Sequence, residues 1–198
     1  MFVLYLYTMK QKKEFFNISL YVVFFFVLML FTSTYFVIIS TNFNNPVARL
    51  TKDYVVYGNG DISTYYTAEE IDHLNEVKEL FGNFADILKY LWLSFILVIY
   101  FFRSSLFRVS KNMFDNAFKL TSIFIISITL VKLILFDNLF ALFHRLFFTT
   151  QWSFSSKSLL IQLFPMSFWM RKTFDVIVLT FALYFVVLIL YRKRLKKK

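Results

Sequence analysis

Four long apolar segments constrain the fold of this chain more than any other feature of its sequence. They run over about 20–39, 87–102, 120–140 and 174–191, and the second and third are short or interrupted by charge. A helix needs roughly 20 apolar residues to cross a bilayer core about 30 Å thick. Apolar residues make up 59% of the chain, which excludes an ordinary soluble domain. We therefore predict an all-α membrane protein, a single membrane domain over 1–198 with four transmembrane helices.

Basic residues indicate how these helices are oriented. They gather at 10–13, 103–119 and 192–198, which the four spans place on one side of the membrane together with only Glu14 and Asp115. By the positive-inside rule that side is cytoplasmic, so both termini lie inside the plasma membrane and segments 41–86 and 141–173 face out. The net charge of +10 then reflects topology and contact with anionic membrane lipids, and no nucleic acid partner is expected.

The first outer segment is predicted to form a small extracytoplasmic cap that begins with a short hairpin or extended arm. Residues 53–57 have strand propensity, and the Gly-Asn-Gly-Asp sequence at 58–61 is a strong turn signal.

An amphipathic helix of about four turns is predicted to complete the cap. Thr67 and Glu70 have the spacing of a capping box, and apolar residues recur at helical spacing after them. Gly82 can break or bend this helix before the second span, which would lay it along the membrane surface. A straight helix would instead hold His73 about 21 Å beyond Ile87.

The chain contains only two histidines and no cysteine, which limits its chemistry. The lack of cysteine excludes disulfides, thiolate metal sites and a cysteine nucleophile, and two histidines are too few for a histidine-rich metal cluster. Neither a metal nor a cofactor is expected. The predicted topology brings His73 and His144 to the same outer face. A purely structural alternative makes Glu70 a helix cap and His73 an interfacial polar residue.

The second outer segment adds an aromatic surface beside His144. Asp137 precedes His144 by seven residues and lies on the same face if the segment is helical. Ionisable groups at such depth are candidates for function. The stretch 159–169 is too short to span and is interrupted at Pro165, so a re-entrant or interfacial segment is predicted there.

Each histidine stands at the centre of a motif. The first motif is Glu70-Ile-Asp-His73-Leu-Asn-Glu76-Val-Lys78. The second begins His144-Arg-Leu-Phe-Phe148 and continues through Trp152 to Leu160-Ile-Gln-Leu-Phe-Pro165 and Phe168. Together they resemble the lipoprotein intramolecular transacylase (Lit) family, and the resemblance covers nearly the whole chain. One departure is Glu76, because an aspartate is expected three residues after the first histidine.

The resemblance implies an acyltransferase of Gram-positive bacteria. Such an enzyme moves the sn-2 acyl chain of a diacylglyceryl lipoprotein to the α-amino group of its N-terminal cysteine, and so produces lyso-form lipoprotein. A diacylated lipoprotein and membrane lipids are then its partners. Because nucleophile and ester belong to one substrate molecule, the enzyme needs no nucleophile of its own, which agrees with the lack of cysteine.

Histidine suits this reaction, because an α-amino group has a pKa near 8 and must lose a proton before it attacks an ester. Which histidine is base and which is acid stays open at this stage. A carboxylate can orient a histidine, and an arginine can stabilise an oxyanion. The predicted catalytic residues are His73 and His144, supported by Glu70, Glu76, Arg145 and Asp137, with an acyl-chain wall of Phe148, Trp152, Phe164 and Trp169.

Two other functions are compatible with the same residues. A non-enzymatic membrane assembly subunit would use both histidines structurally. A lipid acyl hydrolase would use a histidine-activated water and release free fatty acid.

Overall fold

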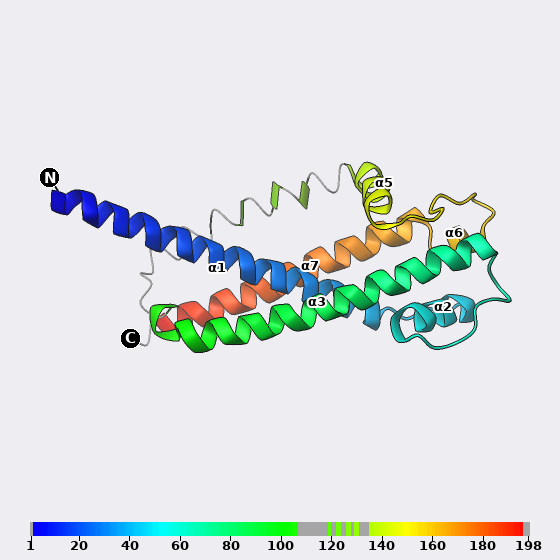
Figure 1. Ribbon diagram of the computed structural model, residues 1–198, viewed down its shortest axis with the longest axis horizontal. Coiled ribbons are helices and arrows are strands. Elements are labelled where there is room, and N and C mark those ends of the chain that lie inside the picture. The colour runs from blue at the N-terminus through cyan, green and yellow to red at the C-terminus, as the bar shows by residue number, and fades with distance from the viewer. Residues whose placement is uncertain are drawn as a thin grey trace.

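The computed structural model describes residues 2–106 and 135–195, together with a few positions between 119 and 130. Three long helices, α1 (Phe2–Ser40), α3 (Ala68–Leu106) and α7 (Met166–Leu195), lie lengthwise along the molecule, with α1 packed on the other two (Figure 1). Three short helices, α2 (Pro46–Tyr57), α5 (Phe136–Phe147) and α6 (Leu159–Leu163), gather toward one end, and the start of α1 and the end of α7 lie at the other. The described residues contain no strand, which confirms the all-helical prediction for them.

Two of the described helices are long and apolar enough to cross a membrane. They contain Val22–Ser40 in α1, with a mean hydropathy of 2.5, and Ala68–Phe101 in α3, with 1.7. The predicted fourth span lies within α7. The predicted third span, 120–140, falls in part outside the described residues, and its last five positions belong to α5. Four spans, and the side of the membrane that each end faces, stay predictions.

The long helices pack through apolar and aromatic side chains. Leu28 and Met29 of α1 and Leu88 of α3 are buried together. Tyr35 and Phe81 stack with ring centroids 5.7 Å apart. In lipid, where tails are as apolar as leucine, such contacts stabilise helix association through close packing rather than through the hydrophobic effect.

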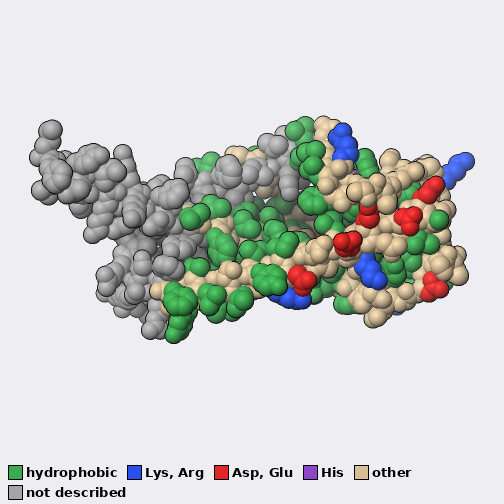
Figure 2. All heavy atoms as spheres, in the orientation of Figure 1, with side chains coloured by type: hydrophobic (Ala, Val, Ile, Leu, Met, Phe, Trp, Pro, Cys, Tyr) green, Lys and Arg blue, Asp and Glu red, His purple; other side chains and the backbone are tan. Residues whose placement is uncertain are grey.

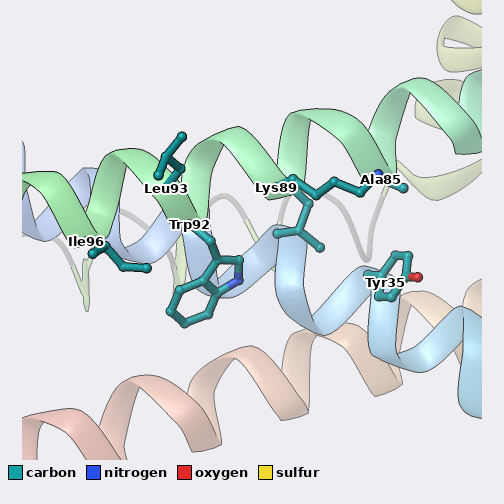
Figure 3. A pocket seen from close by; sticks show the side chains of 7 residues that line it. Tyr35, Ala85, Lys89, Trp92, Leu93 and Ile96 are labelled. Carbon is teal, nitrogen blue, oxygen red and sulfur yellow. The ribbon is translucent and has the colours of Figure 1, made fainter.

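A groove of about 480 Å³ opens between α1 and α3 (Figure 3). Trp92 borders it and donates from its indole nitrogen to the Thr32 hydroxyl of α1 at 3.2 Å. The lining starts at Ala85, which at 1.5 Å per residue lies about 18 Å along α3 from His73. The groove is therefore separate from the two histidines. It is lined by Tyr35, Ala85, Leu88, Lys89, Trp92, Leu93 and Ile96.

The predicted hairpin at 53–57 is wrong, because these residues form the last turns of α2. Asn45 caps that helix, accepting from the backbone N–H of Val47 at 2.8 Å, and Pro46 occupies its first turn. Gly58 ends it with φ 73°, a left-handed conformation that glycine adopts without strain. Strand propensity is a weak preference, and here the burial of one face of α2 overrides it. The turn predicted after it is present as an irregular loop.

Helix α3 runs without a break through Gly82, so of the two alternatives that the sequence left open the continuous helix is the one observed. A glycine inside a helix costs only about 1 kcal/mol, and the turns on either side are stabilised by packing. The amphipathic helix and the second span are therefore one helix, and His73 lies about 21 Å beyond Ile87 along its axis. On the face seen in Figure 2, most of the acidic side chains lie toward the short-helix end, and hydrophobic side chains predominate between them and the grey residues.

A second hydrophobic cluster joins α2, α3 and α6 at the short-helix end. Its buried members are Ile62, Tyr66, Leu74 and Leu160. The Tyr66 hydroxyl forms a buried hydrogen bond of 2.6 Å with the Thr51 hydroxyl of α2. Each fully buried side chain of this size stabilises the fold by about 1.5–3 kcal/mol where the surroundings are aqueous. This cluster fixes the part of α3 that carries the first histidine motif.

Candidate active site at the two histidines

The structure brings the two histidines together at the short-helix end. His73 lies near the start of α3 and His144 in the last turn of α5. Their ring centroids are 5.9 Å apart and the rings are inclined by 26°. His73 is 6% exposed and His144 is half-buried. The two motifs, separated by 71 positions in the sequence (144 minus 73), therefore form one site.

Aromatic side chains surround the pair. Phe148 is buried, with its ring centroid 4.7 Å from His73 and 5.1 Å from His144, so it touches both. Such a wall excludes water and lowers the local dielectric, which strengthens polar interactions inside the site. The other rings of the wall are Phe140 at 4.1 Å and Trp152 at 5.2 Å from His144, and Phe154 at 5.7 Å from His73.

His73 is held in its neutral form. Burial, together with the nearby His144, lowers the pKa of His73 from 6.5 to about 4, and the charge of Glu76 only partly opposes this. Its Nδ1 atom is buried without a hydrogen-bond partner. A buried N–H without an acceptor is costly, so the tautomer with the proton on Nε2 is favoured. His73 then offers an N–H donor at Nε2.

His144 offers a hydrogen-bond acceptor where His73 offers a donor. Its Nδ1 lies 2.8 Å from the carbonyl oxygen of Phe140, one turn earlier in α5. A carbonyl can only accept, so Nδ1 carries the proton and Nε2 of the neutral ring keeps a free lone pair. Burial lowers the pKa of His144, although the hydrogen bond to Phe140 raises it in part. The pair thus combines a proton acceptor on His144 with a donor on His73.

Glu70 joins α3 to α6. Its carboxylate accepts from the Thr67 N–H at 2.9 Å, and the Glu70 N–H donates to the Thr67 hydroxyl at 3.3 Å, which confirms the predicted capping box. The same carboxylate accepts from the Ser158 hydroxyl and, at 3.3 Å, from the Leu160 N–H. Burial raises the pKa of Glu70, but these hydrogen bonds outweigh it and lower the pKa. Among the described residues, none of its hydrogen bonds goes to a histidine.

Glu76 joins α3 to the segment after α5. Its carboxylate accepts from the backbone N–H and the hydroxyl of both Thr149 and Thr150. Burial raises the pKa of Glu76, but these hydrogen bonds lower it to about 2. Within the described part of the chain, Glu76 also makes no hydrogen bond to His73. Its charge nevertheless favours a protonated His73.

Two predicted supporting residues are not brought to the histidines. Arg145 is exposed, and its Nε donates to the Ala141 carbonyl of its own helix at 3.3 Å. Asp137 is exposed in the first turn of α5, about 10 Å along the axis from His144. An acidic side chain in a first turn stabilises the helix dipole, which gives Asp137 a structural role.

The predicted wall divides into two parts. Phe148 and Trp152 contact the histidines, as described above. Phe164 and Trp169 belong to a neighbouring aromatic cluster, in which Phe164 lies 5.5 Å from Phe43. Trp169 links this cluster to the site through Phe140 at 6.4 Å. Leu163 ends α6 and Pro165 precedes α7, so the predicted interruption at Pro165 is present.

Sequence reasoning missed several residues of the site. Phe140 and Phe154 flank the histidines, and Thr149, Thr150 and Ser158 hold the two carboxylates. Phe140 precedes His144 by four residues, so helical spacing alone could have identified it. The hydroxyl residues have no such signal. In the described ranges, no group of three or more His, Asp or Glu side chains is arranged to hold a metal ion.

The comparisons with known proteins identify a family for this chain. A family model described as lipoprotein intramolecular transacylase Lit matches residues 56–169, a stretch that contains both histidine motifs. The resemblance inferred from those motifs is thereby confirmed.

Solved structures share the fold. A structure of the membrane integral lipoprotein intramolecular transacylase Lit from Bacillus cereus is 18% identical, covers 96% of this chain and 98% of its own, and has a TM-score of 0.69. A variant of that protein in which arginine replaces a histidine is 19% identical and covers 100% of this chain and 98% of its own, with a TM-score of 0.67.

A relative described as an uncharacterized protein of Aquifex aeolicus is 26% identical over 134 residues, which are 67% of this chain. The match covers 58% of that relative, so this chain corresponds to less than two thirds of its length.

Proposed function

The chain belongs to the lipoprotein intramolecular transacylase (Lit) family, and from this premise we propose that it transfers the sn-2 acyl chain of a diacylglyceryl lipoprotein to the α-amino group of the N-terminal cysteine. The product is a lyso-form lipoprotein with an N-acylated cysteine. The reaction takes place at the outer face of the plasma membrane, with both termini of the enzyme in the cytoplasm. The observation that carries the proposal is the complementary histidine pair in an aromatic surrounding.

His144 acts as the base. Its Nε2 lone pair is free because Nδ1 donates to the Phe140 carbonyl. The neutral amine attacks the ester carbonyl carbon and forms the new C–N bond, and Nε2 of His144 takes the proton that the nitrogen loses. The lowered pKa of His144 keeps Nε2 unprotonated at neutral pH.

His73 acts as the donor. Its Nε2–H stabilises the negative charge that develops on the carbonyl oxygen in the tetrahedral intermediate. When the ester C–O bond breaks, the glycerol oxygen leaves as an alcohol, taking the proton held by His144. One amine hydrogen is thus transferred to one alcohol oxygen, and both histidines return to their starting forms. Two protonated imidazoles at 5.9 Å would repel each other, which fits a cycle in which only one is charged.

The aromatic wall contacts the acyl chain of the substrate. Phe148, Trp152 and Phe140 present apolar surface to the acyl chain and exclude water, which would otherwise hydrolyse the ester. The difference between transfer and hydrolysis therefore depends on this wall.

Mass spectrometry of a reporter lipopeptide tests the proposal. Cells that express the chain should yield an N-acylated, lyso-form peptide, whereas cells without it should keep both chains on the glycerol. His144→Gln and His73→Gln should abolish the product. Glu69→Gln, a change at an exposed neighbouring position, should not. Unchanged diacyl peptide in wild-type cells would refute the transfer, and activity that survives the loss of either histidine would remove that histidine from the mechanism.

A further inference from the structure

The carboxylate of Glu76 makes more tertiary hydrogen bonds than any other side chain in the described part of the molecule. It accepts from the Thr149 N–H at 3.0 and 3.2 Å and from the Thr150 N–H at 3.2 Å to each oxygen. The Thr150 hydroxyl donates to it at 2.6 Å, and the Thr149 hydroxyl donates as well. Two adjacent residues thus direct every donor they possess to one carboxylate. We call this set the Glu76 clamp.

Each half of the clamp follows one of the two histidines in the sequence. On one side, Glu76 follows His73 by three residues on α3, so both lie within one helical turn. On the other side, Thr149 follows the end of α5, whose last turn contains His144. The clamp therefore connects the two helices that carry the pair.

Apart from its ring contacts, such as those of Phe140 and His144, helix α5 is largely exposed. None of its twelve residues is buried. Phe148, directly after it, is the first buried side chain in this segment, and its ring contacts both histidines. The position of His144 relative to His73 consequently depends on how residues 148–150 are anchored to α3.

The carboxylate is suited to such anchoring. Its donors outweigh the effect of burial and hold its pKa near 2, so it stays charged throughout the physiological range. Hydrogen bonds to a charged acceptor are stronger than those between neutral groups. Neither oxygen bonds to a histidine among the described residues, so apart from its charge, which favours a protonated His73, the carboxylate acts on the site through Thr149 and Thr150.

We propose that Glu76 is a positioning residue that places His144 against His73 through Thr149 and Thr150. This inference rests on the proposed function, because it assigns Glu76 to the geometry of that reaction. A displacement of about 1 Å between catalytic groups can lower a rate about a hundredfold, so loss of the clamp should lower the transfer rate strongly while the fold is retained.

The first arm of the test compares rates. Glu76→Gln turns one acceptor oxygen into an N–H₂ donor that faces other donors, and Thr149→Val/Thr150→Val removes both hydroxyls at nearly constant shape. Glu79→Gln, an exposed glutamate on the same helix, is the matched control. We expect at least a tenfold lower rate of N-acylation for Glu76→Gln, and an unchanged rate for the control. A variant that combines Glu76→Gln with both threonine changes should be no slower than Glu76→Gln alone, because all three changes break the same clamp.

The second arm measures geometry. The chain has only two histidines, so protein labelled on histidine with ¹³C and ¹⁵N and reconstituted in lipid gives solid-state NMR signals from these two rings alone. Wild type and Glu79→Gln should show a cross peak between the rings. Glu76→Gln and the double threonine variant should lose it while keeping helical circular dichroism.

The results of the two arms distinguish a failure of the proposed function from a failure of this inference. A wild type that produces no N-acylated peptide would overturn the proposed function. If the wild type is active and Glu76→Gln lowers the rate of N-acylation less than tenfold, this inference alone would be overturned. A slow Glu76→Gln variant that keeps the inter-ring cross peak would also overturn it, because Glu76 would then act on the reaction directly.

Discussion

Replacing Glu70 by alanine should destabilise the protein without touching a reacting group. Glu70 is 3% exposed, and its carboxylate accepts hydrogen bonds from Thr67, Ser158 and Leu160. Loss of a helix cap costs about 1 kcal/mol. A buried donor left without its acceptor costs about 1–3 kcal/mol, and the Leu160 N–H is the donor here that water reaches least. We therefore expect a loss of about 2–4 kcal/mol for Glu70→Ala.

For a chain of this size, 1 kcal/mol corresponds to about 2–4 °C in melting temperature, so the expected decrease is roughly 4–16 °C. Thermal unfolding in detergent, followed by circular dichroism, measures it. Glu69→Ala is the matched control, because Glu69 is exposed in the same first turn of α3. Equal melting temperatures for Glu70→Ala and Glu69→Ala would refute the assignment of Glu70 as the link between α3 and α6.

Four further predictions test other parts of the structure. Gly60→Ala should destabilise by about 1–3 kcal/mol in thermal melts, because Gly60 has φ 96° and an added Cβ would lie 2.5 Å from Leu50 Cδ1. Gly82→Ala should stabilise by up to about 1 kcal/mol, because its Cβ meets nothing within 4 Å. Wild type should lose stability as the pH falls from 6.5 to 4, because the unfolded chain protonates His73 first and the folded pKa of His73 is about 4. His73→Gln should show a smaller loss, to which His144 still contributes because its pKa is also lowered, and an identical profile would disprove the depressed pKa of His73. Phe148→Ala should admit water and raise the pKa of His73 toward 6.5 in an NMR titration, whereas an unchanged pKa would contradict the role of burial.

The sequence predicted the local features of the site well. The Thr67–Glu70 capping box depends on four consecutive residues, and it is present as two hydrogen bonds. The apolar residues after Thr67 recur at helical spacing, which predicts a helix there, and the helix is present. His73 and His144 could be placed at one end of the molecule because the long apolar segments limit where each can lie.

The features that the sequence did not reveal depend on tertiary contacts. Residues 53–57 favour a strand by composition, yet Asn45 and the packing of α2 on α3 make them helical. Glu76 meets Thr149 across 73 positions, and the register between α3 and that loop has no local signature. The tautomer of His144 depends on one carbonyl four residues earlier, so the proposal that His144 is the base required the structure.

Transfer of a labelled acyl chain tests the central claim most directly. Purified protein in lipid would receive a synthetic diacylglyceryl lipopeptide that carries deuterium only in its sn-2 chain, and tandem mass spectrometry would locate the label. We predict that the deuterated chain appears on the α-amino nitrogen of the cysteine, with no labelled free fatty acid, and that His144→Gln prevents this. Labelled free fatty acid without N-acylated peptide would contradict intramolecular transfer and identify a hydrolase instead.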